Sequence, residues 1–148
     1  MIFDTPHTYF SKPPSINNTG SGGIKLRSTE SDNFIMVKLS DGEDLFSSLE
    51  AIVRKHDIKA GAFLGGIGML RDFETGYWTG KEYLAEFHEA PHELLHFGGS
   101  IATVDGKPAF HIHCTVAGQD HKVIGGHVNK ATVAVLNEIV IRKFPEMD

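Results

Sequence analysis

The chain has 148 residues, of which 41% are hydrophobic and 22% are charged. These values are typical of a single globular domain that buries a hydrophobic core. The formal net charge is −5 and the four arginines are scattered, which argues against binding nucleic acid by bulk electrostatics. A single cysteine excludes an intramolecular disulfide, so we expect a protein of the reducing cytoplasm.

The first 23 residues differ in composition from the rest of the sequence. They are rich in Pro, Gly, Ser and Asn, which predicts an extended arm or linker over residues 1–23 and one domain over 24–148. Two interpretations of the arm remain open: its aromatic residues anchor it on a neighbouring surface, or it has no function. We expect no signal peptide and no membrane span, because the longest apolar run, 60–70, is short and glycine-rich.

The next segment predicts two strands and a helix. A short strand is expected over 24–27 and a clearer one over 34–39. Residues 40–44 offer N-cap and acidic first-turn residues for an amphipathic helix over 43–56. Its apolar stripe recurs at helical spacing, and Glu50 and Arg54 form an i,i+4 pair on its solvent side. The stripe consists of Leu45, Leu49, Ile52, Val53 and His56.

Residues 60–70 are small and apolar and include four glycines. They complete no Gly-x-Gly-x-x-Gly or Gly-Lys-Ser/Thr motif, so we interpret them as a glycine-rich strand that another backbone approaches closely. Residues 73–87 predict a hairpin with its turn at 79–82. A further strand is expected over 93–104, with a bulge or close contact at Gly98 and Gly99, followed by a tight turn over 105–108.

Histidines occur every four residues at positions 88, 92 and 96. On a helix this spacing would align them as metal ligands. Pro91 breaks such a helix, so we do not interpret His88, His92 and His96 as a metal site.

The pattern around residues 110–116 organises the rest of the chain. As a strand, it places Phe110, Ile112, Cys114 and Val116 on one apolar face. Cys114 is therefore expected to be an inert core residue. The opposite face carries His111, His113 and Thr115.

A third imidazole, His127, follows Gly125 and Gly126, where we expect the backbone to turn sharply and return to the same point. Three neutral imidazoles with an open fourth position suit zinc, and such sites also take Ni, Co, Cu or Fe. The alternative is that each of His111, His113 and His127 is an ordinary, half-exposed strand residue.

Residues 131–143 predict a long strand that is apolar on both sides. Ala131, Val133, Val135, Ile139 and Ile141 are expected on one face, and Ala134, Leu136 and Val140 on the other. One helix can cover one face only, so a neighbouring subunit is expected on the other, in a homo-oligomer.

Several of these segments resemble the plants-and-prokaryotes conserved (PPC) domain family. The resemblance extends over about residues 33–144 of this chain. The segments that carry the resemblance are 41–45, 65–70, 75–78, 93–101, 105–113 and 123–128. The resemblance implies an α+β single domain with a mostly antiparallel sheet and one main amphipathic helix, assembled as a trimer. It also implies that His111, His113 and His127 bind zinc.

Plant members of that family join the domain to a basic AT-hook that enters the DNA minor groove. This chain has no such segment. We therefore favour a trimeric metal-binding or regulatory module that acts on transcription through a protein partner, or that takes a small-molecule ligand at the metal. Direct DNA binding by the domain is the least favoured function.

The alternative is a zinc-dependent lyase or hydrolase that acts on a small oxygen-rich substrate, with the metal as Lewis acid. The similarity of the family's fold to that of acetolactate decarboxylase suggests it, by analogy of fold alone. Such an enzyme needs a general acid or base near the metal. The sequence offers Glu74, Glu93, Glu138 and Arg71, each of which is more simply a solvated or structural charge. No catalytic residue is assigned.

Overall fold

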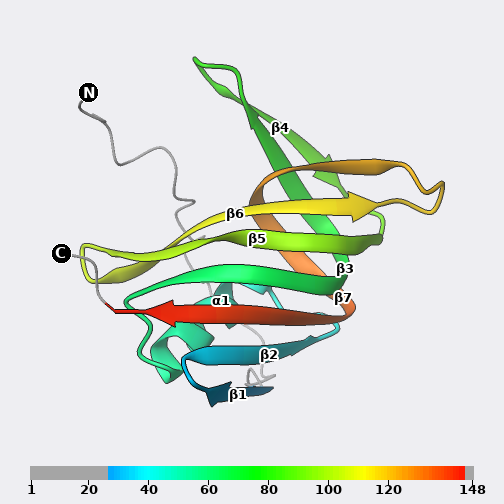
Figure 1. The fold of residues 1–148 in the computed structure, drawn as a ribbon. Coiled ribbons are helices and arrows are strands. Elements are labelled where there is room, and N and C mark those ends of the chain that lie inside the picture. The colour runs from blue at the N-terminus through cyan, green and yellow to red at the C-terminus, as the bar shows by residue number, and fades with distance from the viewer. Residues whose placement is uncertain (1–26, 146–148) are drawn as a thin grey trace.

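The computed structural model describes residues 27–145, which form a mostly antiparallel β-sheet domain with one α-helix (Figure 1). This confirms the α+β class and the single helix. The strands are β1 (Arg27–Ser31), β2 (Phe34–Ser40), β3 (Ala60–Trp78), β4 (Tyr83–His88), β5 (His92–Val104), β6 (Lys107–Ala117) and β7 (Val123–Phe144), and the helix is α1 (Leu45–Lys55).

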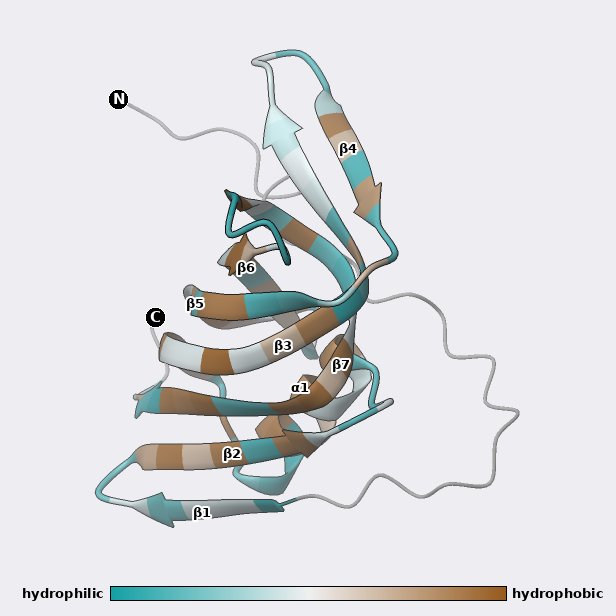
Figure 2. Ribbon diagram, turned by 90° about the vertical axis from the view of Figure 1, so that its right-hand side faces the viewer, coloured by the Kyte–Doolittle hydropathy of each residue, from teal (hydrophilic) through white to brown (hydrophobic). Residues whose placement is uncertain are grey.

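The sheet closes partly on itself. Its strand order is β1-β2-β7-β6-β5-β3-β4, and an additional pairing joins β7 to β3. The pairings β7–β6, β6–β5, β5–β3 and β3–β7 therefore form a closed circuit of four strands, which produces the strong curvature seen in Figure 2. The β3–β4 hairpin projects beyond this circuit (Figure 1).

Helix α1 begins at its N-cap Asp44, whose carboxylate accepts a hydrogen bond of 2.8 Å from the Ser47 backbone amide. The predicted helix and its apolar stripe are confirmed, since Leu45, Leu49, Ile52 and Val53 are buried. The expected Glu50–Arg54 pair is present at 3.3 Å. In Figure 1 the helix lies behind the sheet, against β2 and β7.

Four phenylalanines form the centre of the core between helix and sheet. The ring of Phe46 on α1 lies 6.2 Å from that of Phe110, and Phe63 contacts both Phe110 and Phe97 at 6.1 and 5.1 Å. Aromatic rings at these separations add to the stability that comes from burying their area. Each strand of the circuit that bears one of these rings is thereby fixed to the same core.

Most of the predicted strands are confirmed, but the boundary expected between two of them is absent. Residues 60–70 and the first half of the predicted hairpin form one continuous strand, β3, and the hairpin turn lies at 79–82 as expected. The turn over 105–108 also forms, with Asp105 and Gly106 at positive φ. The arm over 1–23 and nearly all of the strand expected over 24–27 lie outside the described residues. In the described part of the chain, no helix is long and apolar enough to cross a bilayer.

The simple alternation expected for 131–143 is wrong at one position. Val135 has φ +62° and is 65% exposed, so it does not share a face with the buried Val133 and Ile139. The register between β3 and β7 also shifts beside it, between Gly68 and Met69. Gly68 pairs with Asn137 and Met69 with Ala134, so β7 carries two extra residues at this point. Two extra residues leave the inward and outward positions that follow unchanged, and a pattern of period two does not reveal the interruption.

The close backbone contact predicted at Gly98 and Gly99 is confirmed at Gly99. The register between β5 and β6 shifts nearby, between Leu94 and His96. Gly99 has φ +151°, and a Cβ placed on it would overlap the carbonyl oxygen of His111. Only glycine therefore allows β5 to pair this closely with β6.

We predict that Gly99→Ala lowers the free energy of unfolding by about 2–5 kcal/mol, because it combines an unfavourable φ with overpacking. Chemical denaturation measures this loss. Gly65→Ala is the matched control, since a Cβ at Gly65 meets nothing within 4 Å and its φ is not positive. Equal stabilities of the two variants would contradict the proposed constraint.

Candidate metal centre

Strand β6 presents two imidazoles on one face and apolar side chains on the other. Phe110, Ile112 and Val116 are fully buried, as predicted. His111 is half-buried and His113 is exposed on the opposite face. The alternation of this strand therefore separates the core from the site.

The third imidazole reaches the site through strand pairing. His127 lies directly opposite His113 in the antiparallel register of β6 and β7. The sharp turn expected at Gly125 and Gly126 is wrong, because both residues lie within β7.

Close backbone packing explains these two glycines. A Cβ on Gly125 would overlap the carbonyl oxygen of Cys114 on β6. A Cβ on Gly126 would lie 2.9 Å from the carbonyl oxygen of Gly76 on β3. The absence of side chains lets β7 fit between both neighbours and places His127 beside His113.

The three side chains converge. One nitrogen from each of His111, His113 and His127 lies within 4.8 Å of the other two. The Nε2 atoms of His111 and His113 are 3.1 Å apart. Tetrahedral zinc with Zn–N bonds of about 2.0–2.1 Å separates its nitrogens by about 3.4 Å. The donor set and its spacing therefore fit a divalent transition metal after small side-chain movements.

Burial favours the neutral, metal-binding form of two of these imidazoles. His127 is 5% exposed, and desolvation, followed by the positive charges of His111 and His113, lowers its pKa to about 4. Desolvation and His113 also lower the pKa of His111. Both imidazoles are thus ready to coordinate near pH 7 without first losing a proton.

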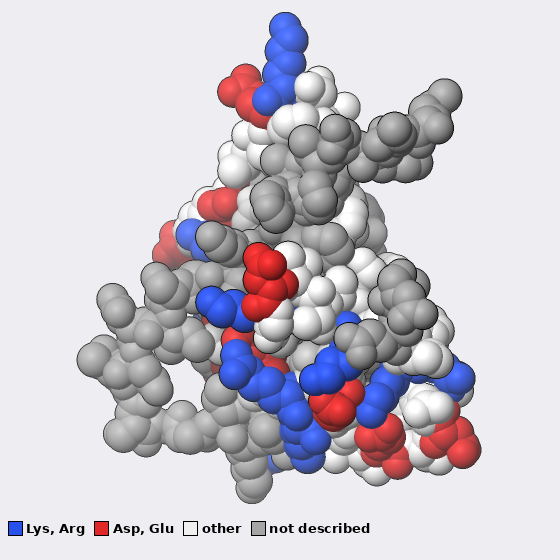
Figure 3. Space-filling model, turned by 90° about the vertical axis from the view of Figure 1, so that its left-hand side faces the viewer, with Lys and Arg blue, Asp and Glu red and all other residues white. Residues whose placement is uncertain are grey.

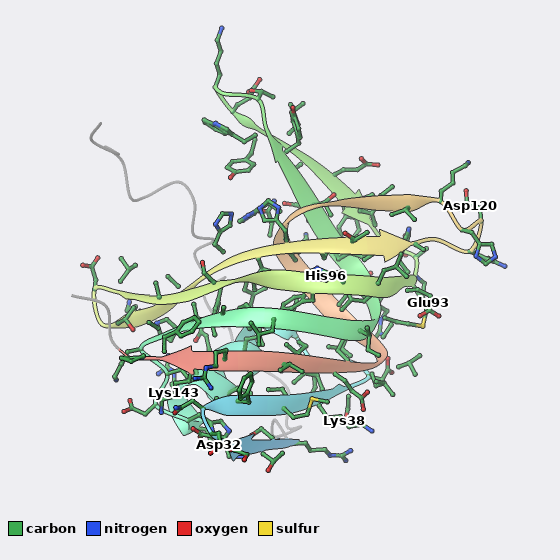
Figure 4. The ribbon with its side chains drawn as sticks, in the orientation of Figure 1. Asp32, Lys38, Glu93, His96, Asp120 and Lys143 are labelled. Carbon is green, nitrogen blue, oxygen red and sulfur yellow. The ribbon has the colours of Figure 1, made fainter. Side chains whose placement is uncertain are left out.

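A hollow of about 590 Å³ lies beside His111 and His113, over β5, β6 and β7. Its walls also include side chains of Ser100 and Thr115, and the ring of His96. Figure 4 shows His96 in the middle part of β5, with Glu93 nearer the N-terminal end of that strand.

Sequence reasoning missed His96 because it grouped that residue with His88 and His92. The structure separates them: His88 and His92 pack against Phe73, with ring centroids 4.7 and 5.1 Å from it. The available signal was strand alternation. His96, Gly98 and Ser100 lie opposite Thr115, His113 and His111 in the register of β5 and β6.

None of the acidic or basic candidates lines this hollow in the described part of the chain. Glu74 accepts a hydrogen bond of 2.9 Å from Asn129, and Arg71 pairs with Asp41 at 2.8 Å. Cys114 behaves as expected for a core thiol, since burial raises its pKa to about 11.

These observations define a curved antiparallel domain with a cluster of three imidazoles on its outer face. The model of the Plants and Prokaryotes Conserved (PCC) domain matches residues 26–145. The chain belongs to this family, which confirms the resemblance found in its sequence. No curated protein matches it significantly.

Solved structures share the fold. A metal-containing protein from Archaeoglobus fulgidus is 28% identical, with a TM-score of 0.68 over 83% of this chain and 86% of that one. A candidate DNA-binding protein from Ralstonia eutropha is 25% identical, with a TM-score of 0.73 over 80% and 83%. A plant- and prokaryote-conserved protein from Pyrococcus horikoshii is 24% identical, with a TM-score of 0.70 over 82% and 83%.

We predict that the metal-free protein loses stability as the pH falls from about 6.5 to about 4. His127 has a pKa of about 4 when folded, against its ordinary value of 6.5, so the unfolded chain binds more protons in this window. The expected loss is about 1–3 kcal/mol, measured by urea unfolding in the presence of a chelator. His127→Gln should show a smaller loss, and an unchanged pH dependence in that variant would contradict the prediction.

Proposed function

We propose that this protein is a metal-binding module that holds zinc, or another divalent transition metal, on His111, His113 and His127. The observation that best supports the proposal is the convergence of three imidazole nitrogens within 4.8 Å. A metal held in this way offers a Lewis-acidic position to water or to a ligand. The relative from Archaeoglobus fulgidus, described as metal-containing, is consistent with the proposal.

The surroundings of the three histidines favour a binding module over an enzyme. In the described residues, the hollow beside them has no carboxylate or guanidinium in its wall. General acid–base catalysis needs a titratable group in reach of the substrate, and His96 is such a group in this wall besides the proposed metal ligands. We propose a role in binding or regulation because the described residues of the wall include no carboxylate, and a lyase or hydrolase activity is the second candidate function. The single cysteine, buried as a thiol, is consistent with a cytoplasmic location.

For DNA, we propose an indirect connection through a protein partner. The relative from Ralstonia eutropha is described as a candidate DNA-binding protein. The net charge of this chain is −5, and on the face drawn in Figure 3 basic and acidic side chains are interspersed. Among the ion pairs of the domain, Lys59 pairs with Asp57 at 2.8 Å. Direct binding to phosphates is favoured by an array of cations without interspersed carboxylates, so the mixed charges of this face do not favour it.

We further propose that the protein is a homotrimer that buries the outer apolar face of its sheet. This face is opposite α1, and its large side chains are 46–58% exposed. It consists of Phe34, Met36, Leu64, Ile67 and Leu95. Exposed apolar side chains of this kind on one side of a sheet, here on β2, β3 and β5, are typical of a subunit interface.

The outer apolar face continues into the metal centre. Ala62 on β3 lies opposite Ser100 on β5, which in turn lies opposite His111 on β6, so the three side chains share one side of the sheet. A subunit packed on this side would lie beside the imidazole cluster. The proposed assembly and the proposed site are therefore neighbours.

The metal proposal predicts about one transition-metal ion per chain in protein purified without a histidine tag. His113→Ala should lose most of this metal, because two imidazoles bind far more weakly than three. Elemental analysis of both proteins provides the test. His121→Asn is the control: it removes an exposed imidazole of a loop, and Asn tolerates the positive φ of 62° at this position. Equally metal-free wild-type and variant proteins would contradict the proposal.

The trimer proposal predicts that Ile67→Glu converts the assembly to monomers, because a charge would be buried in an apolar interface. Light scattering after size-exclusion chromatography measures the mass. Leu84→Glu is the matched control, since Leu84 is 56% exposed on β4, outside the outer apolar face, while Ile67 is 58% exposed. A monomeric wild-type protein, or dissociation by both variants alike, would contradict the assigned interface.

A further inference from the structure

The hollow beside the metal centre has a chemical character of its own. Its wall contains imidazoles and hydroxyl groups, and in the described chain it contains no acidic side chain. Three neutral imidazoles leave the double positive charge of a bound divalent metal uncompensated. A ligand in this hollow is therefore favoured if it is an anion, and a cation is repelled.

His96 is held over the sheet next to His113. A Cβ on Gly98 would lie 2.7 Å from Cε1 of the His96 ring and 3.5 Å from its Nδ1. The ring therefore lies on the space left by the missing side chain of Gly98. Because Gly98 is the cross-strand neighbour of His113, His96 and His113 line the hollow from the same side of the sheet.

Two hydroxyl groups complete this surface. Ser100 lies opposite His111, and Thr115 lies opposite His96, and both are half-buried in the wall of the hollow. A neutral imidazole can donate one N–H, and each hydroxyl can donate one O–H. Hydrogen-bond donors thus line the hollow next to His111 and His113, and an oxygen-rich anion is the ligand that such donors recognise.

We propose that the hollow binds a small oxyanion, with one oxygen on the metal and another accepting a hydrogen bond from His96. This inference rests on the proposed metal site and adds the class of ligand that the site recognises. Its distinctive feature is the span: the ligand must reach from the metal to β5. A monatomic anion bound to the metal has no second atom that could accept a hydrogen bond from His96.

The test uses the protein loaded with Co²⁺, whose visible absorption reports changes in coordination. Acetate, inorganic phosphate and chloride are titrated separately into the wild type, His96→Ala and Gly98→Ala. We expect His96→Ala to weaken acetate binding about tenfold, because a hydrogen bond to a charged group is lost. Gly98→Ala should weaken it in the same direction by displacing the ring. Chloride binding should be unchanged in both variants.

Each outcome has a defined meaning. Unchanged acetate binding in His96→Ala, or an equal loss for acetate and chloride, would overturn the proposal. Loss of Co²⁺ itself from His96→Ala would also overturn the proposal, because it would identify His96 as a metal ligand. A wild type that takes up no Co²⁺ refutes the proposed function, whereas one that takes up Co²⁺ but does not respond to acetate refutes only this inference. His121→Asn is the control that should bind acetate as the wild type does.

Discussion

The antiparallel pairing of β6 with β7 is the contact on which the site depends. It places His127 opposite His113, and it is possible only because glycines at 125 and 126 let three backbones approach one another. A side chain at either position would separate the strands before the imidazoles could meet. The same pairing is one side of the closed circuit of strands, so the geometry of the site and the curvature of the sheet have one cause.

The circuit also explains why one face of β6 can carry the imidazoles of the candidate site. Phe110 and Ile112 secure the strand to the core from the other side, through contacts that include Phe46 and Phe63. His111 and His113 lie on the opposite face of the strand, and burial lowers the pKa of His127 and so favours its neutral ring. A strand that the core holds in place on one face, and that carries imidazoles on the other, is well suited to bind a metal and its ligand.

Much of this arrangement could be predicted from the sequence, because it depends on local patterns. The period-two pattern of 110–116 identified both faces of β6, and the apolar stripe identified α1. The convergence of His111, His113 and His127 was predicted, although the reason given for His127 was wrong, since a strand pairing and not a turn brings it to the other two. Strand register is set by contacts between distant segments, and the sequence of one segment does not contain it.

The same limit applies to His96 and Val135. His96 belongs to the site only because β5 lies next to β6, and its spacing from His88 and His92 suggested a different grouping. Val135 departs from its expected face because of a backbone irregularity at a residue type that disfavours positive φ. Periodicity describes regular elements, so it fails where an element is interrupted.

The position of β7 in the chain affects how the protein folds during its synthesis. This strand pairs with β2, β3 and β6, which are all made before it. The emerging polypeptide therefore cannot close its circuit of strands, or assemble all three imidazoles, until residues 123–144 have left the ribosome. Such late, long-range closure slows folding and leaves apolar strand edges open in the meantime. Under the proposal that the three imidazoles hold a metal, its capture follows translation of the domain and does not guide the early stages of folding.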